Sequence, residues 1–223
     1  MKNNNTDSRK ILTRNDLLTG LLCLLGMIPG LVCYNRLPNT IPIHWGIDNQ
    51  PDNWAGKNFV IFVMPLLMLA LHLLCCAADN LLGQKDSTPK ALHSLVRLTV
   101  PVLTVFIECV TMLAVMNHLS DVGRVVLVLL GVMFIFIGNY LPKTRPNRTV
   151  GIKLPVTLRN EEVWRRTHRL AGWLEVIGGI LTIALAFMGL TVPAAVVVFV
   201  AALLPIPCAY VIDARVKKEG KTE

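Results

Sequence analysis

Residues 171–212 read AGWLEVIGGILTIALAFMGLTVPAAVVVFVAALLPIPCAYVI, and Glu175 is the one charged residue among them. A helix needs about 20 mostly apolar residues to cross a bilayer, so this stretch is long enough for two crossings. The tripeptide Thr191-Val192-Pro193 predicts a tight turn at its middle, because proline is tolerated in the first turn of a helix but breaks its interior. The stretch therefore predicts two antiparallel membrane spans, Ala171–Leu190 and Val192–Ile212.

The same apolar pattern fills most of the chain. Hydrophobic residues make up 53% of the 223 residues and charged residues 16%, whereas a soluble domain carries about 25% charged residues. The apolar blocks also lack the polar stripe that helices of a soluble core usually carry. We therefore expect an all-α fold, a polytopic membrane bundle of six transmembrane helices. The first four spans are predicted at Leu17–Tyr34, Asn58–Ala78, Val96–Met116 and Arg124–Leu141.

The basic residues are distributed unevenly about these spans. With spans of alternating direction, 19 of the 22 Lys and Arg residues fall on one side of the membrane. Lys and Arg concentrate in cytoplasmic loops, so both termini are expected to be cytoplasmic. The net charge of +8 then reflects topology and contact with the lipid bilayer. No nucleic-acid-binding motif occurs, and direct binding of nucleic acid is not expected.

The spans and loops divide the chain into two three-span modules. The first block is too long for a secretion signal, and no cleavage site of small residues follows it, so it counts as a span. The expected segments are a cytoplasmic tail (1–16), a three-span module (17–116) with an extracytoplasmic loop (35–57), a second three-span module (117–212) with a cytoplasmic loop (142–170), and a second tail (213–223).

Four polar residues lie inside the predicted spans. Glu108 lies past the middle of the third span, toward the outer side, whereas the other three lie at similar depth near the cytoplasmic loop and can meet there. A polar group in hydrocarbon is costly, so each either has a function or forms hydrogen bonds between helices. His72 shares a helix face with Cys75 and Cys76, but this set does not complete a zinc site, and no metal or cofactor is expected. The four intramembrane candidates are His72, Glu108, Asn139 and Glu175.

The two longer loops carry most of the local signals. In the outer loop, Thr40–Trp45 is typical of a short extended segment, and Asn49 suits a turn residue with positive φ. In the cytoplasmic loop, Pro146-Asn147 suits the turn of a small hairpin. Asn160 there predicts a helix N-cap, with a juxtamembrane helix that starts near Glu161 and continues into the fifth span. Trp164 and His168 share a face of that helix, and its Arg residues can also simply extend toward lipid headgroups.

Motifs in both loops resemble a known family. Gly138-Asn139, then Gly151-Ile152-Lys153-x-Pro155-x-Thr157-Leu158, then Glu161-Glu162-Val163-Trp164-x-x-Thr167-His168-Arg169-x-Ala171-Gly172 resemble the signature of the SdpI family of bacterial membrane proteins. The outer loop, with Ile41-Pro42-x-His44-Trp45, Pro51-Asp52 and Lys57, resembles the small uncharacterised module that often precedes it. The chain has Val156 where the family usually has Trp, and Asn49 where the module usually has Gly.

The resemblance implies a non-enzymatic protein of the bacterial cell membrane. Its expected functions are immunity against a secreted peptide toxin and signalling through a cytosolic repressor held at the membrane. A small transporter or ion-coupled protein built on Glu108, or a membrane enzyme, is the alternative. The expected outer site comprises Pro42, His44, Trp45, Pro51, Asp52 and Lys57. The expected cytoplasmic partner site comprises Gly151, Pro155, Thr157, Glu162, Trp164, Arg166, Thr167, His168 and Arg169.

Overall fold

The computed structural model describes residues 11–82, 90–147 and 150–220. Within them, six helical segments are long and apolar enough to cross a membrane, which confirms the predicted number and order of spans. The segments are Arg14–Arg36, Phe59–Leu81, Arg97–Val115, Val122–Lys143, Glu161–Phe187 and Thr191–Glu219. The α-helices are α1 (Arg14–Leu21), α2 (Met27–Cys33), α3 (Met64–Leu82), α4 (Lys90–Val115), α5 (Val122–Tyr140), α6 (Pro155–Arg159), α7 (Glu161–Phe187), α8 (Thr191–Leu203) and α9 (Pro205–Glu219).

Prolines interrupt three of the spans. A 3₁₀ segment, Leu22–Gly26, lies just before Pro29 in the first span, and a π-helical turn, Phe59–Val63, lies just before Pro65 in the second. Pro205 begins α9 directly after α8 has ended. Proline has no N–H to donate to the carbonyl four residues earlier, so the preceding turn takes a different hydrogen-bond spacing.

The turn between the last two spans lies earlier than predicted. α7 ends at Phe187, and Gly189 adopts a positive φ of 76°. The N–H of Leu190 then donates to the carbonyl of Leu185 over 2.9 Å, a closure typical of helix ends with a left-handed glycine. The prediction of a turn at 191–193 was therefore displaced, although Pro193 does lie in the first turn of α8.

The outer loop forms a β-hairpin. Strands β1 (Thr40–Trp45) and β2 (Pro51–Gly56) pair antiparallel, with Thr40 opposite Gly56 and Trp45 opposite Pro51. The predicted extended segment and the positive φ of Asn49, 61°, are confirmed. The second strand was not predicted, because Pro51–Gly56 lacks the β-branched residues that mark strands.

The hairpin predicted for the 142–170 loop was wrong. Residues 144–147 and 150–154 contain no strand, and the short helix α6 follows them. The turn signal itself is real, because the Asn147 side chain accepts from the Val150 N–H over 2.7 Å. The chain after this turn packs against α7 instead of returning beside its own first arm.

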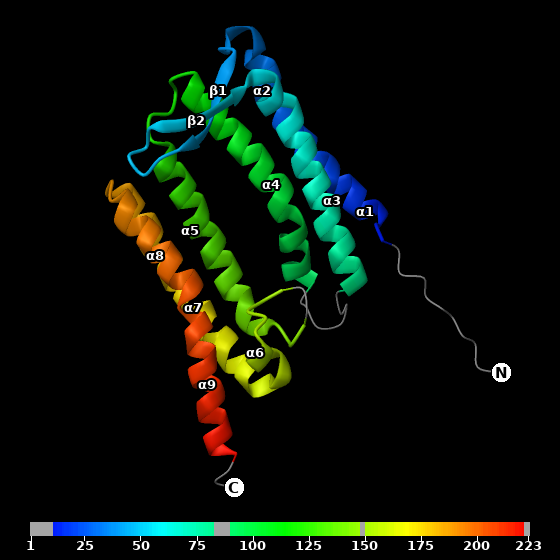
Figure 1. The fold of residues 1–223 in the computed structure, drawn as a ribbon, viewed down its shortest axis with the longest axis vertical. Helices are drawn as coiled ribbons and strands as arrows, with labels where there is room; N and C mark the ends of the chain where they lie inside the picture. Colours follow the sequence, from blue (N-terminus) through cyan, green and yellow to red (C-terminus); the bar gives the residue numbers. More distant parts are fainter. Residues whose placement is uncertain (1–10, 83–89, 148–149, 221–223) are drawn as a thin grey trace, which may run out of the picture.

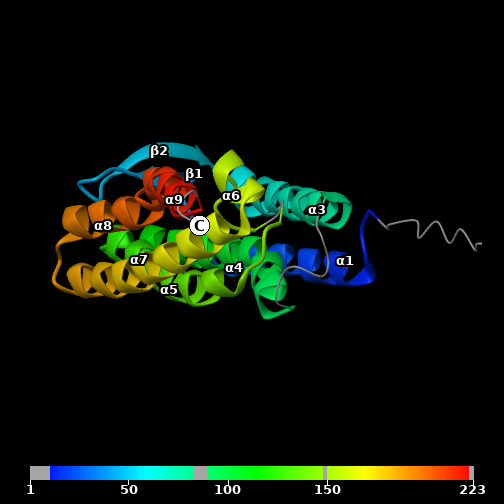
Figure 2. The same ribbon diagram turned by 90° about the horizontal axis from the view of Figure 1, so that it is seen from below.

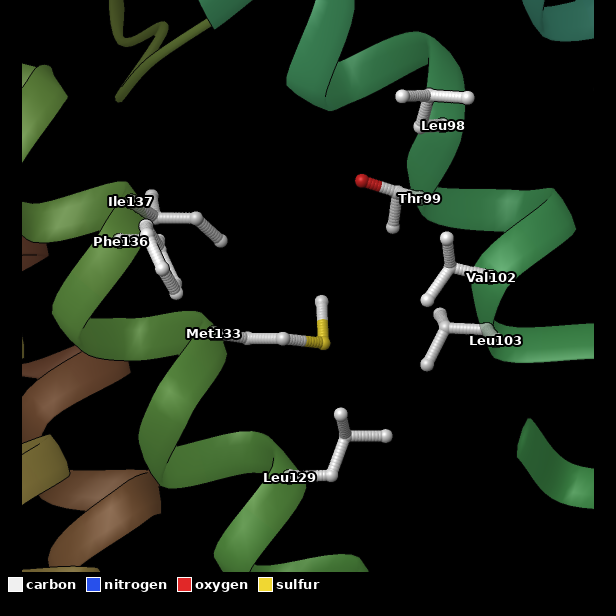
Figure 3. Close-up of a pocket in the computed structure, with 8 residues that line it drawn as sticks. All are labelled: Leu98, Thr99, Val102, Leu103, Leu129, Met133, Phe136 and Ile137. Atoms are coloured by element: carbon white, nitrogen blue, oxygen red, sulfur yellow. The ribbon is translucent and has the colours of Figure 1, made fainter.

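The helices form two groups (Figures 1 and 2). α1 to α4 pack together, while α5 packs most extensively against α7, which also contacts α8 and α9. α4 and α5 make only limited contact with each other, and an apolar cavity of about 100 Å³ lies between them (Figure 3). The hairpin lies at one end of the bundle, here named the hairpin end. α6 and the end of α9 lie at the other, here named the α6 end.

Candidate functional site

The hairpin presents an exposed His–Asp pair. His44 on β1 and Asp52 on β2 lie across the two strands, with Nδ1 2.6 Å from Oδ1. Both side chains are more than half exposed, at 67% and 51%. The sheet register brings together these two predicted site residues, which are eight positions apart in sequence. An exposed pair of this kind adds little stability, so it is available for recognition.

The hairpin turn is fixed to the start of α5. Asn49 Nδ2 donates to the carbonyl of Ser120 over 2.8 Å, and the Gly123 N–H donates to Asn49 Oδ1 over 2.9 Å. These bonds join a loop that follows the first span to the beginning of the fourth span. Sequence reasoning identified Asn49 as a turn residue but gave no signal for these contacts, which join residues 71 and 74 positions apart.

A cavity of about 470 Å³ lies beneath the hairpin. β1 and the hairpin turn form one wall, and the ends of α4, α5 and α8 nearest the hairpin form the others. Trp45, a residue of the expected outer site, is half-buried in this wall. Trp54 on β2 is 52% exposed.

The remaining predicted outer residues frame the hairpin. Pro42 lies opposite Trp54 in the sheet, and Pro51 begins β2. Lys57 follows β2, and its Nζ lies 4.4 Å from the centre of the Tyr34 ring, a cation–π contact. These three residues shape the hairpin and its junction with the first two spans.

The signature at the α6 end forms a buried core. Trp164 and His168 stack with ring centres 3.9 Å apart, and they are 1% and 0% exposed. Trp164 Nε1 donates to the carbonyl of Thr144 over 3.0 Å, while the Ile152 N–H donates to His168 Nε2 over 2.9 Å. Because Nε2 accepts, Nδ1 carries the proton and donates to the Trp164 carbonyl at 2.9 Å. These bonds fasten the loop to the first turns of α7.

The loop residues of the signature support this core. Gly151 has a φ of 117°, and a Cβ there would collide with the His168 ring. Thr157 Oγ1 donates to the Ile152 carbonyl over 2.7 Å and accepts from the Leu154 N–H over 3.0 Å. Thr167 is fully buried as well. The predicted shared face of Trp164 and His168 thus exists, but it faces inward, which corrects the expectation of a partner surface there.

Charged residues of the same segment remain exposed. Arg166 forms a bidentate pair with Glu219 of α9 at 3.1 and 2.8 Å, and its Nε donates to Glu162 over 2.6 Å. Arg169 is exposed, and within the described ranges no ion pair is seen for it. Pro155, at the start of α6, is exposed too. The exposed residues of this predicted site are therefore mainly charged, whereas Trp164 and His168 are buried.

His72 belongs to a polar network within the first three spans. Its Nε2 lies 3.1 Å from Thr19 Oγ1, 3.2 Å from the Asp16 carbonyl and 3.5 Å from Cys76 Sγ, whereas Cys75 is exposed. Asp16 is fully buried and lies 2.8 Å from both Arg97 Nη1 and Asn80 Nδ2, which joins α1, α3 and α4. Sequence reasoning missed Asp16, although the pattern Thr13-x-x-Asp16 before an apolar run is a helix-capping signal.

The other intramembrane candidates do not meet His72. Glu108 is buried at 4% exposure against the first span, with Cγ 3.3 Å from the Cβ position of Gly26. Glu175 on α7 packs against Gly138 of α5, and Asn139 is exposed. The predicted meeting of His72, Asn139 and Glu175 was wrong, because α3 and α7 belong to different helix groups. Among the described residues, no group of three His, Cys, Asp or Glu can hold a metal ion.

Two separate regions of the chain match known protein families or domains. Residues 143–211 match the model of the SdpI/YfhL protein family, and residues 21–69 match a domain of unknown function, DUF1648. The chain is similar to Immunity protein SdpI of Bacillus subtilis (strain 168), at 25% identity over 174 residues that cover 78% of this chain and 82% of that protein. No solved structure matches the chain. The chain is therefore a multi-pass membrane protein in which the region that matches the SdpI/YfhL family model covers the fifth span and most of the sixth, and the region that matches DUF1648 contains the hairpin.

Proposed function

We propose that the protein protects a bacterial cell from a secreted peptide toxin, with the hairpin end outside the cell and the α6 end in the cytoplasm. The similarity to an immunity protein supports this function in general terms. The observation that carries the specific proposal is the exposed His44–Asp52 pair on a hairpin fixed across both helix groups. A rigid, exposed hairpin is a surface that an arriving peptide can meet without first crossing the bilayer.

The charge bias supports the proposed orientation. Cysteine at Asn53 of β2, on a background without native cysteines, should react with a membrane-impermeant maleimide in intact cells. Cysteine at Arg159, which ends α6, should react only after the cells are permeabilised. Both positions are exposed, so burial cannot explain a lack of reaction, whereas Asn147 is unsuitable because it is 3% exposed. The opposite labelling pattern would refute this orientation.

Survival under challenge tests the protective function directly. Sensitive cells without an immunity protein of their own would express the full chain or carry an empty vector. Both would receive medium conditioned by the organism from which the chain comes. The proposal predicts a higher survival with the chain, and equal survival at confirmed membrane expression would refute it.

We also propose a cytoplasmic signalling role, in which a repressor binds the charged surface at the α6 end. Arg159 and Arg169 support it, since both are exposed and have no ion-pair partner within the described part of the chain. Exchanging both for Ala should reduce reporter induction without lowering the membrane abundance of the protein. Unchanged induction would argue against this surface.

The alternative, an ion-coupled function of Glu108, predicts a different mutational pattern. Glu108 Oε2 has no hydrogen-bond partner within the described ranges, and no ion pair of Glu108 is seen there. We therefore expect Glu108→Gln, which keeps the shape and polarity, to preserve protection. Complete loss of protection in Glu108→Gln at normal abundance would instead favour use of the ionised carboxylate.

A further inference from the structure

We propose that the cavity beneath the hairpin binds an apolar, extended segment of the secreted peptide; this assignment rests on the proposed protective function. The cavity lies where the hairpin of the first helix group covers the ends of α5 and α8 from the second. Neither helix group forms it alone. Its volume of about 470 Å³ falls within the roughly 300–1,000 Å³ that is usual for ligand pockets.

The chemistry of the walls favours a peptide over a phospholipid headgroup. Most lining side chains are aliphatic or aromatic, including Phe106, Ile107 and Val126. Polar side chains are few, and no Lys or Arg lines the cavity to neutralise a phosphate. A pocket with apolar walls and a few polar groups suits an apolar side chain attached to a hydrogen-bonding main chain.

The hairpin supplies a second reason for a peptide. Within the described residues the sheet has two strands, so β1 pairs with β2 along one edge and its other edge pairs with no strand. Residues Ile43 to Trp45 of β1 line the cavity. An extended peptide can form main-chain hydrogen bonds with such an edge while its side chains enter the neighbouring pocket. A lipid acyl chain has no groups that could form these bonds.

Filling the cavity should remove protection. Ile107→Trp places a larger side chain in the cavity, and Leu113→Trp is its matched control, since both residues are 47% exposed on α4 and Leu113 is not among the lining residues. Ala195→Phe and Val196→Phe form a second pair on adjacent residues of α8, of which Ala195 alone lines the cavity. A side chain that overfills the cavity should weaken peptide binding roughly tenfold or more. Cells that express such a variant should then be half killed at a peptide concentration roughly tenfold lower than cells that express the wild-type chain.

Membrane abundance decides whether a variant is informative. If Ile107→Trp or Ala195→Phe is present at the wild-type level and loses protection while its control keeps it, the assignment is supported. Full protection by both cavity variants would overturn the assignment and leave the protective function intact. Failure of the wild-type chain to protect would instead refute the protective function, and the assignment with it.

Photo-crosslinking identifies the occupant. The photoreactive p-benzoylphenylalanine would replace Ile47, which lines the cavity and is 79% exposed, or Trp54, which is 52% exposed on β2 and is not among the lining residues. The probe is the peptide purified from conditioned medium by its killing activity, added to cells that express the full chain. We expect an adduct of the peptide's mass at position 47, absent at position 54 and reduced by Ile107→Trp. A lipid adduct alone, or no peptide adduct in cells that are protected, would overturn the assignment.

Discussion

At the scale of single residues, the family signature fixes the fold of the α6 end. Trp164 and His168 are buried, and their hydrogen bonds end on the backbone of Thr144 and Ile152. A buried polar ring without its partner would cost about 1–3 kcal/mol, so each bond secures the loop against the first turns of α7. Trp164 and His168 therefore act in the packing of this end of the molecule.

Gly151 provides the sharpest test of this account. Its φ of 117° and the collision of an added Cβ with His168 mean that Gly151→Ala should destabilise the protein by about 2 kcal/mol or more. Gly56→Ala is the control, because no atom lies within 4 Å of the Cβ it would add. Thermal unfolding in detergent should show a lower midpoint for Gly151→Ala alone. Equal midpoints for the two variants would contradict the proposed packing.

At the scale of elements, close backbone contact joins α5 and α7 into one unit within the second helix group. A Cβ at Gly138 would lie 2.7 Å from the carbonyl oxygen of Gly172, and one at Gly131 would lie 2.8 Å from that of Gly179. Small residues allow membrane helices to approach this closely, and van der Waals contact along both backbones then stabilises the pair. The two contact points are one heptad apart on each helix, so they share a face.

A larger side chain at this contact should separate the helices. Gly138→Val is expected to reduce stability by about 1–3 kcal/mol, because overpacking forces a shift of backbone and not just of a flexible side chain. The adjacent Asn139 is exposed, so Asn139→Val serves as the control on the same helix. Thermal midpoints and membrane abundance should fall for Gly138→Val only. If midpoint and abundance fall equally in Gly138→Val and Asn139→Val, the contact with α7 does not explain why a larger side chain is disfavoured at Gly138.

The elements themselves could largely be predicted from the sequence, since apolar length and turn residues are local signals. The six spans, β1, the Asn160 cap and the long helix from Glu161 follow from such signals. The heptad spacing of glycines and the capping pattern of Asp16 were present too but were not used. The inward direction of Trp164 and the contacts of Asn49 could not be predicted, because they depend on residues distant in the chain.

At the scale of the whole molecule, the hairpin joins two helix groups whose direct contact is thin. Two cavities lie along the boundary of α4 and α5, one between residues 98–103 of α4 and 129–137 of α5 (Figure 3) and the other beneath the hairpin. The hydrogen bond that Asn49 donates to the Ser120 carbonyl and the one that it accepts from the Gly123 N–H therefore hold the hairpin over the second group. α5 is in turn packed closely on α7.

Substitutions of Asn49 separate the contribution of its side-chain hydrogen bonds from that of its positive φ. Asn49→Gly keeps the positive φ but removes both hydrogen bonds, whereas Asn49→Ala removes the bonds and adds backbone strain of about 1–2 kcal/mol. We expect both variants to raise hydrogen exchange at the start of α5, with the larger increase in Asn49→Ala. Exchange that stays at the wild-type level in both would show that the hairpin is held by other contacts.

The central claim is that protection is provided at the hairpin end. It is tested most directly by survival under toxin challenge at matched membrane abundance, with two matched pairs of exposed residues changed to Ala. His44 and Asp52 represent the hairpin end, and Arg166 and Arg169 represent the α6 end. All four side chains are exposed, and exposed charges contribute about 0–1 kcal/mol to stability, so both double variants should insert normally. The account predicts that the His44/Asp52 variant loses protection and that the Arg166/Arg169 variant keeps it. Full protection by the former and loss by the latter would contradict the account.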